Sequence, residues 1–146
     1  MINFDRDPTA SLEDEFRRFA HANGWGKKSA RYKRERRNFY ASAVIEDFTS
    51  FWGSSDSRLQ AWQELCRHLG LTTIPTSIRG CKKALKPIHV NLIDLVDSKR
   101  QNTTPEIFPS EDALAAYIRR TGKIFMKDRA KANPLLRQFL VIVFGY

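Results

Sequence analysis

The residues best suited to chemistry in this sequence are the cations of residues 27–37, which read Lys-Lys-Ser-Ala-Arg-Tyr-Lys-Arg-Glu-Arg-Arg. Seven Lys or Arg against one Glu give this window +6 of the chain's +9 net charge. On a helix, such side chains sweep one flank, where they can meet successive phosphates and release condensed counterions. The residues that we expect to contact a polyanion here are Lys27, Lys28, Arg31, Lys33, Arg34 and Arg37, with Tyr32 stacking on an exposed base or ribose.

Two other interpretations of this window stay open. The first is a solvated helix end, although positive charge at a helix N-terminus opposes the helix dipole and therefore hints at a purpose. The second is a nuclear-import signal, which also consists of clustered Lys and Arg. Polyanion binding is the leading hypothesis of the three.

Two further basic groups occur later in the chain. One gathers Arg119, Arg120, Lys123, Lys127, Arg129 and Lys131, and the other comprises Lys82, Lys83, Lys86, Lys99 and Arg100. If the groups converge in space they form a groove for a phosphate backbone, and if they are dispersed they are ordinary solubilising charge. The residues from these groups that we add to the predicted nucleic-acid-binding set are Lys82, Lys83, Lys86, Arg119, Arg120 and Lys123.

Residues 89–97, His-Val-Asn-Leu-Ile-Asp-Leu-Val-Asp, place polar side chains regularly within an apolar stretch. On a helix, Asn91, Asp94 and Asp97 share one edge because they are three residues apart. A hard metal ion accepts such oxygens but usually needs more ligands and a flexible loop. General acid–base work would need His89 within reach of a carboxylate, and its phase relative to Asp94 is poor. We therefore expect structural hydrogen bonds here and no metal site.

Recognisable catalytic motifs are absent from the sequence, with no H-E-x-x-H, no G-x-S-x-G, no glycine-rich phosphate loop and no paired C-x-x-C. Cys66 and Cys81 each lie in an apolar helical pattern and are expected to be buried thiols. We predict no catalytic residue, no cofactor and no small-molecule substrate. The leading function is a basic helical module that binds nucleic acid, DNA or RNA. The alternative is a protein-interaction or scaffolding domain, dimeric through exposed aromatics of the second helix or through an apolar last helix.

Helix start and stop signals recur at regular intervals and predict an all-α, compact bundle of five to seven helices, forming a single domain over residues 1–146. Capping Ser and Asn residues precede apolar stripes, and Gly follows their ends. We expect an N-terminal arm over residues 1–10 and the longest loop over residues 98–109. A strand is an open alternative for 88–96, which is rich in β-branched residues. The expected helices run from Ser11 to Gly24, Ser29 to Trp52, Ser57 to Gly70, after Thr76 to Pro87, over 88–96, Ser110 to Gly122, and from Asn133 onwards.

The composition fits a folded protein without a membrane span. Of the 146 residues, 42% are hydrophobic and 12% aromatic, which is enough to build a core. The longest apolar stretch, residues 139–144, is far too short to cross a bilayer. The acidic opening also lacks the apolar region of a secretory signal. We expect an intracellular protein, in the nucleus rather than the cytoplasm.

Several sequence blocks follow one another in a recognisable order. The blocks are Phe4-Asp-x-Asp-Pro8, Glu15-Phe-Arg, Gly24-Trp25, Trp62-Gln-x-Leu-Cys66, Cys81, His89 to Asp97, and Tyr117-Ile-x-x-Thr-Gly-Lys-Ile-Phe125. Together they resemble a family of small, functionally uncharacterised helical domains of filamentous fungi, and the His89–Asp97 block is the most specific element. The chain departs from the family pattern at Pro87 and in its more basic residues 27–37. The resemblance implies a standalone intracellular helical domain and supplies no activity.

Overall fold

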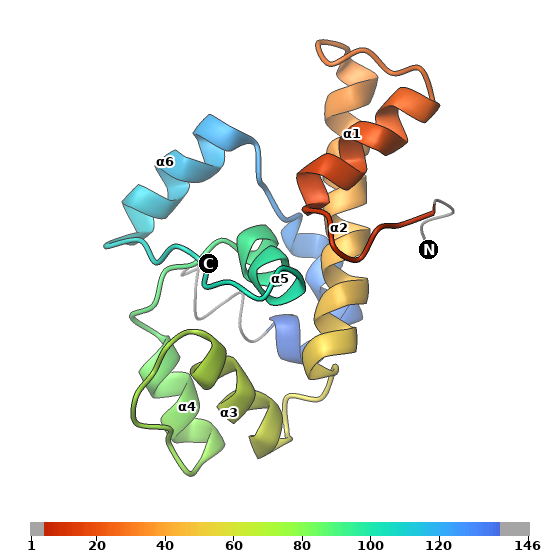
Figure 1. Cartoon of the computed structure of the whole chain (residues 1–146). Coiled ribbons are helices and arrows are strands. Elements are labelled where there is room, and N and C mark those ends of the chain that lie inside the picture. The colour runs from red at the N-terminus through yellow and green to blue at the C-terminus, as the bar shows by residue number, and fades with distance from the viewer. Residues whose placement is uncertain (1–4, 138–146) are drawn as a thin grey trace.

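The computed structural model describes residues 5–137 and confirms the predicted all-α compact bundle (Figure 1). Within those residues, extended pairing is confined to one bridge between His89 and Phe108. The helices are α1 (Leu12–Ala22), α2 (Ala30–Trp52), α3 (Leu59–His68), α4 (Ile78–Leu85), α5 (Leu92–Arg100), α6 (Glu111–Thr121) and the short 3-10 helix η1 (Lys127–Ala132).

The long helix α2 organises the bundle (Figure 1). Helix α1 packs against its first half, and α5 packs against it from the centre of the molecule. Helices α3 and α4 form a pair at the end where α2 stops, whereas α6 lies well away from that pair. Fully buried side chains from several of these helices, including Phe16, Tyr40, Phe48 and Trp62, join them into one core.

Local capping explains most of the helix boundaries. The side chains of Ser11, Ser29 and Ser110 each accept a hydrogen bond from the amide three residues along, as the sequence predicts. Helix α6 ends at Gly122, whose φ of 73° is in the left-handed region that glycine tolerates. The predicted start of α3 at Ser57 is wrong by one residue. The capping position belongs to Arg58, without a side-chain cap, while Ser57 contacts Ser55.

The segment after Pro87 differs most from expectation. Helix α4 ends at Leu85, as the proline requires, but α5 covers Leu92–Arg100 instead of residues 88–96. The reason is Asn91, whose side-chain oxygen accepts hydrogen bonds from the amides of Ile93 and Asp94 and so fixes the helix start. His89 precedes this cap and pairs with Phe108, and the loop expected from residue 98 begins only after Arg100.

The C-terminal helix begins as predicted. The side chain of Asn133 accepts a hydrogen bond from the amide of Leu136, and Leu135 and Leu136 are buried. The apolar remainder of that predicted helix, beyond Arg137, lies outside the described residues. No helix in the part of the chain that the structure describes is both long and apolar enough to cross a membrane.

Candidate functional site

A basic groove lies between the first half of α2 and the end of α6. Its volume is about 320 Å³, and we call it the α2–α6 groove. Five of its lining residues are cations and none is a carboxylate. Its residues are Lys27, Tyr32, Lys33, Arg36, Arg37, Ile118, Arg119, Gly122 and Ile124.

Helix geometry explains why these cations meet. Lys33, Arg36 and Arg37 are three and four residues apart, so they share one face of α2. The left-handed turn at Gly122 ends α6, and both Arg119 before the turn and Ile124 after it line the groove together with the α2 residues. The groove therefore joins residues separated by more than 80 positions in the sequence.

Arg36 is the cation that the structure holds most firmly in the groove. Its Nη2 donates to the carbonyl of Thr121 at 3.3 Å, and its guanidinium lies 5.9 Å from the ring centre of Tyr40. A Cβ atom on Gly122 would overlap this guanidinium, so the glycine is needed for the close approach as well as for its φ. The predicted contact set omits Arg36, although its spacing from Lys33 and Arg37 was a sufficient signal.

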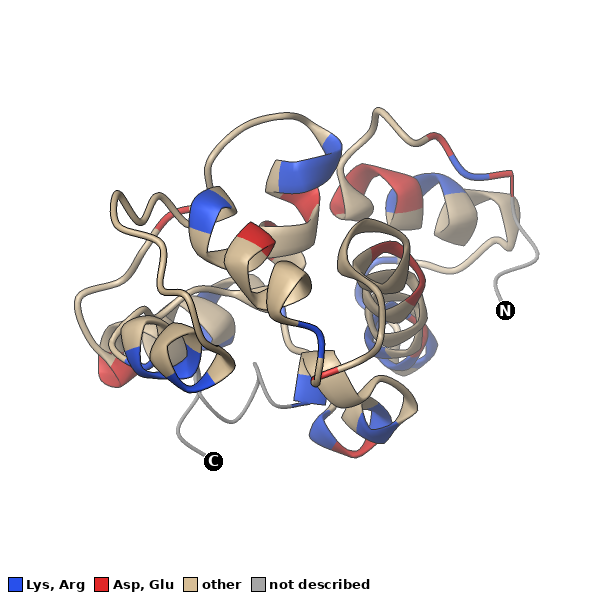
Figure 2. Ribbon diagram, turned by 90° about the horizontal axis from the view of Figure 1, so that it is seen from below, with Lys and Arg blue, Asp and Glu red and all other residues tan. Residues whose placement is uncertain are grey.

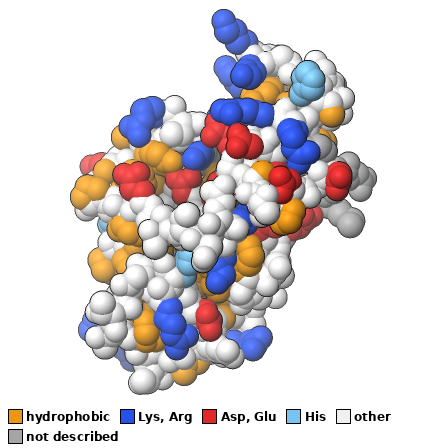
Figure 3. Space-filling model, viewed as in Figure 1, with side chains coloured by type: hydrophobic (Ala, Val, Ile, Leu, Met, Phe, Trp, Pro, Cys, Tyr) orange, Lys and Arg blue, Asp and Glu red, His pale blue; other side chains and the backbone are white. Residues whose placement is uncertain are grey.

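No carboxylate in residues 5–137 pairs with a cation of the groove. Lys27, Lys33, Arg37 and Arg119 form no ion pair with any carboxylate of residues 5–137. Figure 3 shows Lys and Arg side chains gathered over the upper part of the molecule, where α2 begins and α6 ends, with Asp and Glu just below them. The unpaired charge leaves this part of the surface attractive to anions.

The remaining predicted residues of the first basic group lie next to the groove but do not line it. Lys28, Arg31 and Arg34 are exposed. The guanidinium of Arg31 lies 5.2 Å from the ring centre of Trp25, and Arg34, whose side chain is 63% exposed, reaches Glu35 only at 3.9 Å. These three cations extend the basic surface around the start of α2.

The structure contradicts the predicted stacking role of Tyr32. The side chain is only 8% exposed, and its ring packs edge-on against Phe16 with a centroid distance of 4.9 Å. Its ring face is therefore not open to a base. Tyr32 contributes instead to the floor of the α2–α6 groove.

The three basic groups converge only in part. Lys82, Lys83 and Lys86 belong to α4 and its C-terminal cap, far from the start of α2, and they do not line the groove (Figure 1). Lys82 instead lies 5.5 Å from the ring centre of Trp62. Figure 2 likewise shows Lys and Arg at several separate places on the fold. Of the second group, Arg119 alone lines the groove.

Lys123 is engaged inside the protein. Its Nζ lies 2.9 Å from Oδ1 of Asp94 and 3.3 Å from the hydroxyl of Tyr117. Burial disfavours its charge, but the hydrogen bond and charge of Asp94 outweigh burial and raise the pKa of Lys123 above its ordinary value. Arg120 lies over the same tyrosine, 5.4 Å from the ring centre. Both therefore belong to a local cluster outside the groove.

Asn91, Asp94 and Asp97 make structural hydrogen bonds, as expected, whereas Nδ1 of His89 is buried without a partner among the described residues. Asn91 caps α5 and donates to the carbonyl of Lys123 at 2.8 Å. Asp94 accepts from the hydroxyl of Tyr117 at 2.6 Å, and Asp97 accepts from the amide of Leu12 at 2.8 Å. No His, Cys, Asp or Glu cluster in the described residues is arranged to hold a metal ion.

A buried ionic cluster was missed by the sequence analysis. Arg100, whose side chain is 4% exposed, lies 2.9 Å from Glu15 and 2.8 Å from Asp47, and Arg6 binds the same two carboxylates. Counting Arg100 with the solubilising cations is therefore wrong. The available signal was Glu15, which falls in phase with the apolar stripe of α1 between Leu12 and Phe19.

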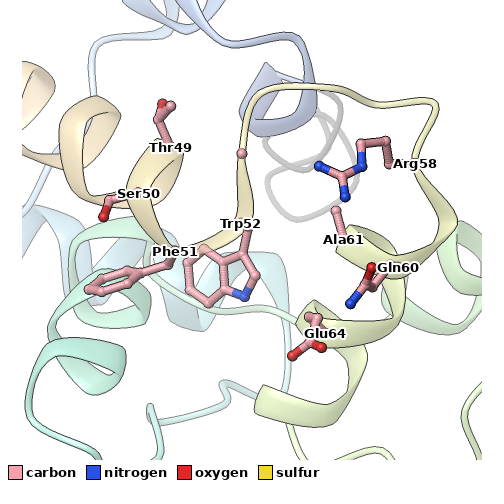
Figure 4. Close-up of a pocket in the computed structure, with 9 residues that line it drawn as sticks. Thr49, Ser50, Phe51, Trp52, Arg58, Gln60, Ala61 and Glu64 are labelled. Carbon is pink, nitrogen blue, oxygen red and sulfur yellow. The ribbon is translucent and has the colours of Figure 1, made fainter.

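A second cavity of about 370 Å³ lies between the end of α2 and the start of α3 (Figure 4). One cation, Arg58, and one carboxylate, Glu64, line it, so it lacks the charge bias of the α2–α6 groove.

The aromatics of α2 that the scaffolding hypothesis requires at the surface are mostly internal. Phe39, Tyr40, Phe48 and Trp52 are all buried.

No family model, curated protein or solved structure matches this chain. The resemblance to fungal helical domains therefore stays a prediction. The α2–α6 groove is a candidate site on its geometry and charge alone.

Proposed function

We propose that this protein binds a polyanion, and specifically nucleic acid, in the α2–α6 groove. The observation that carries the proposal is the meeting of five cations from two distant segments in one concave surface that no carboxylate lines. Four of these cations, Lys27, Lys33, Arg37 and Arg119, are exposed, so a phosphate backbone can displace the counterions around them without any loss of internal contacts.

The lining residues suit phosphate chemistry in different ways. Arg36, Arg37 and Arg119 present planar guanidinium forks that match two phosphate oxygens at once, while lysines act as mobile point charges. Each phosphate neutralised on duplex DNA contributes about 0.9 to the slope of log affinity against log salt. Five engaged cations would therefore give a slope of about −4 to −5 on duplex DNA, and a smaller one on single strands.

The test compares two triple charge reversals by fluorescence anisotropy with labelled DNA and RNA at two salt concentrations. The groove variant is Lys33→Glu/Arg37→Glu/Arg119→Glu. The matched control is Arg79→Glu/Lys83→Glu/Lys86→Glu, which makes the same change in net charge with exposed cations on and next to α4. We expect the groove variant to lose at least tenfold in affinity and about 3 in the duplex salt slope.

The control variant should lose far less affinity, because long-range charge alone is weakened by screening. Equal losses in the two variants would contradict the proposal, as would the absence of binding by the unaltered protein at low salt. Circular dichroism of both variants checks that the helices remain folded.

We also propose a nuclear location, in which the exposed cations around the start of α2 serve as an import signal. Lys27, Lys28 and Arg31 are all accessible to a transport receptor. A fluorescent fusion should leave the nucleus when these three residues are changed to Glu. Unchanged nuclear fluorescence in that variant would contradict this role.

A further inference from the structure

We infer that the α2–α6 groove takes unpaired nucleotides, so that the protein prefers single-stranded nucleic acid to duplex. The inference rests on the proposed function and adds the class of nucleic acid to it. Three features of the groove point in this direction: its concave shape, its apolar floor and the fixed position of one arginine.

The shape of the groove excludes the usual way in which a helix meets a duplex. A recognition helix projects its side chains into a major groove about 12 Å wide. The basic face of α2 at Lys33, Arg36 and Arg37 does not project, because the end of α6 flanks it and Arg36 bonds to Thr121. A duplex can therefore only lie across the opening of the groove. The volume of the groove, about 320 Å³, is within the range of sites that enclose small ligands.

Part of the groove lining is apolar or aromatic, and we call this part, formed by Tyr32, Ile118 and Ile124, the floor. Ile124 is 42% exposed, and of the large hydrophobic side chains in residues 5–137 only Ile107 is comparably exposed, at 43%. Ile118 and Tyr32 continue the apolar surface. The faces of paired bases are hidden in their stack, so a duplex would place only sugar and phosphate on this floor. An unpaired base can cover the floor with its own apolar face while flanking phosphates meet the cations.

One group is already in place for a ribose or a phosphate. Arg36 is held over Gly122 by its bond to Thr121 before any ligand arrives. A ligand therefore meets partly ordered donors, which lowers the entropy lost on binding.

The first experiment uses the unaltered protein and three labelled probes with equal numbers of phosphates. The probes are a 12-nucleotide single-stranded thymidine oligomer, the same backbone without bases, and a short duplex. We expect the thymidine oligomer to bind about tenfold tighter than the other two, because base contacts of this kind contribute on that scale.

The second experiment changes the floor without changing charge. Ile124→Ser should weaken binding of the thymidine oligomer about fivefold and leave the abasic probe unchanged, since only the bases touch the floor. Ile107→Ser is the matched control, because Ile107 is equally exposed but does not line the groove. It should change neither affinity.

The outcomes separate this inference from the proposed function. Equal affinity for all three probes, or tighter binding of the duplex, overturns the single-strand inference and leaves groove binding of phosphates standing. Failure of every probe to bind at low salt overturns both. Because the probe comparison needs no variant, it decides the question even if Ile124→Ser does not fold.

Discussion

Arginines occupy two contrasting regions of this molecule. In the buried ionic cluster, Arg6 and Arg100 are enclosed by Glu15, Asp47 and backbone carbonyls, and Glu15 is completely buried. In the α2–α6 groove, Arg37 and Arg119 remain exposed and have no carboxylate partner within the described residues. The two regions are separated along α2, whose first half carries the groove and whose second half supplies Asp47.

The difference shows which cations of the chain are free to bind a ligand, which the net charge alone does not reveal. A cation removed from water must be matched by anions of the protein, and once matched it stabilises the fold and is closed to a ligand. A cation left in water needs no internal partner and can exchange its counterions for phosphates. Four predictions test this contrast by substituting buried or exposed residues and measuring stability, nucleic-acid affinity or both.

The largest effect is expected from Arg100→Met. The variant leaves the buried Glu15 and the partly buried Asp47 with Arg6 as the cation they share, and breaking such a buried pair costs about 3–5 kcal/mol. Urea denaturation measures the free energy of unfolding. Arg34→Met, at an exposed arginine, is the control and should change that free energy by less than about 0.5 kcal/mol. Similar stability of the two variants would remove the contrast between the regions.

A smaller effect is expected from Asp97→Asn, beside the buried ionic cluster. Burial, opposed by the amide of Leu12, raises the pKa of Asp97 to about 6 from its ordinary 3.8. Between about pH 4 and 6 the folded protein therefore binds a proton that the unfolded chain has lost, so the charge of Asp97 lowers stability as the pH rises.

Asparagine keeps an oxygen for the Leu12 amide but does not titrate. The unfolding free energy of Asp97→Asn, relative to that of the unaltered protein, should therefore increase by about 2–3 kcal/mol between pH 4 and pH 7. Denaturation curves at the two pH values measure this difference. A difference that is independent of pH would contradict the assigned burial.

Gly122→Ala tests the groove through the position of Arg36. The substitution forces a left-handed φ on alanine, which costs about 1–2 kcal/mol, and its Cβ displaces the guanidinium of Arg36. Gly70→Ala is the matched control, with a φ of 86° and no atom within 4 Å of the added Cβ. Both variants should lose similar stability by thermal denaturation, but only Gly122→Ala should lose nucleic-acid affinity, about threefold or more. Equal affinities would show that Arg36 does not contact the ligand.

The smallest effects come from a pair of lysine substitutions. Lys123→Met breaks the contact with Asp94 and should lower the free energy of unfolding by about 1 kcal/mol, with no change in nucleic-acid affinity. Lys33→Met should do the reverse, leaving stability unchanged and reducing the duplex salt slope by about 0.9. Denaturation and anisotropy on both variants measure the four values. A stability loss in Lys33→Met together with a smaller salt slope in Lys123→Met would contradict the roles given to the two lysines.

The helix boundaries were largely predictable because capping is local. Ser11, Ser29 and Ser110 bond to amides only three residues away, so the sequence contains the whole interaction. The start of α5 was not predicted, although its cap is equally local, because the helix was expected over residues 88–96 and Asn91 was not considered as a cap. The bond from Asn91 to the carbonyl of Lys123 joins residues 32 positions apart and could not be predicted from sequence.

The positive charge of the candidate site was predictable from the sequence, but the residues that line it were not all predictable. The window of residues 27–37 does supply most of the groove's cations. Lys123 and Arg100 could not be distinguished from it by sequence, because their partners Asp94 and Glu15 are 29 and 85 residues away. The predicted role of Tyr32 in stacking on a base was wrong. Its ring instead packs against Phe16, and this contact depends on how α1 crosses α2, which the sequence does not reveal.

The hydrogen bond between Asp97 and the amide of Leu12 has a consequence for protein synthesis. During translation, α1 leaves the ribosome with that amide unmatched by a carboxylate, and its final acceptor is made 85 residues later. Arg100, which binds the carbonyl of Ala10, follows three residues after that. The local Ser11 cap can form at once, but the bonds to Leu12 and Ala10 must wait for α5, and contacts of such long range form slowly.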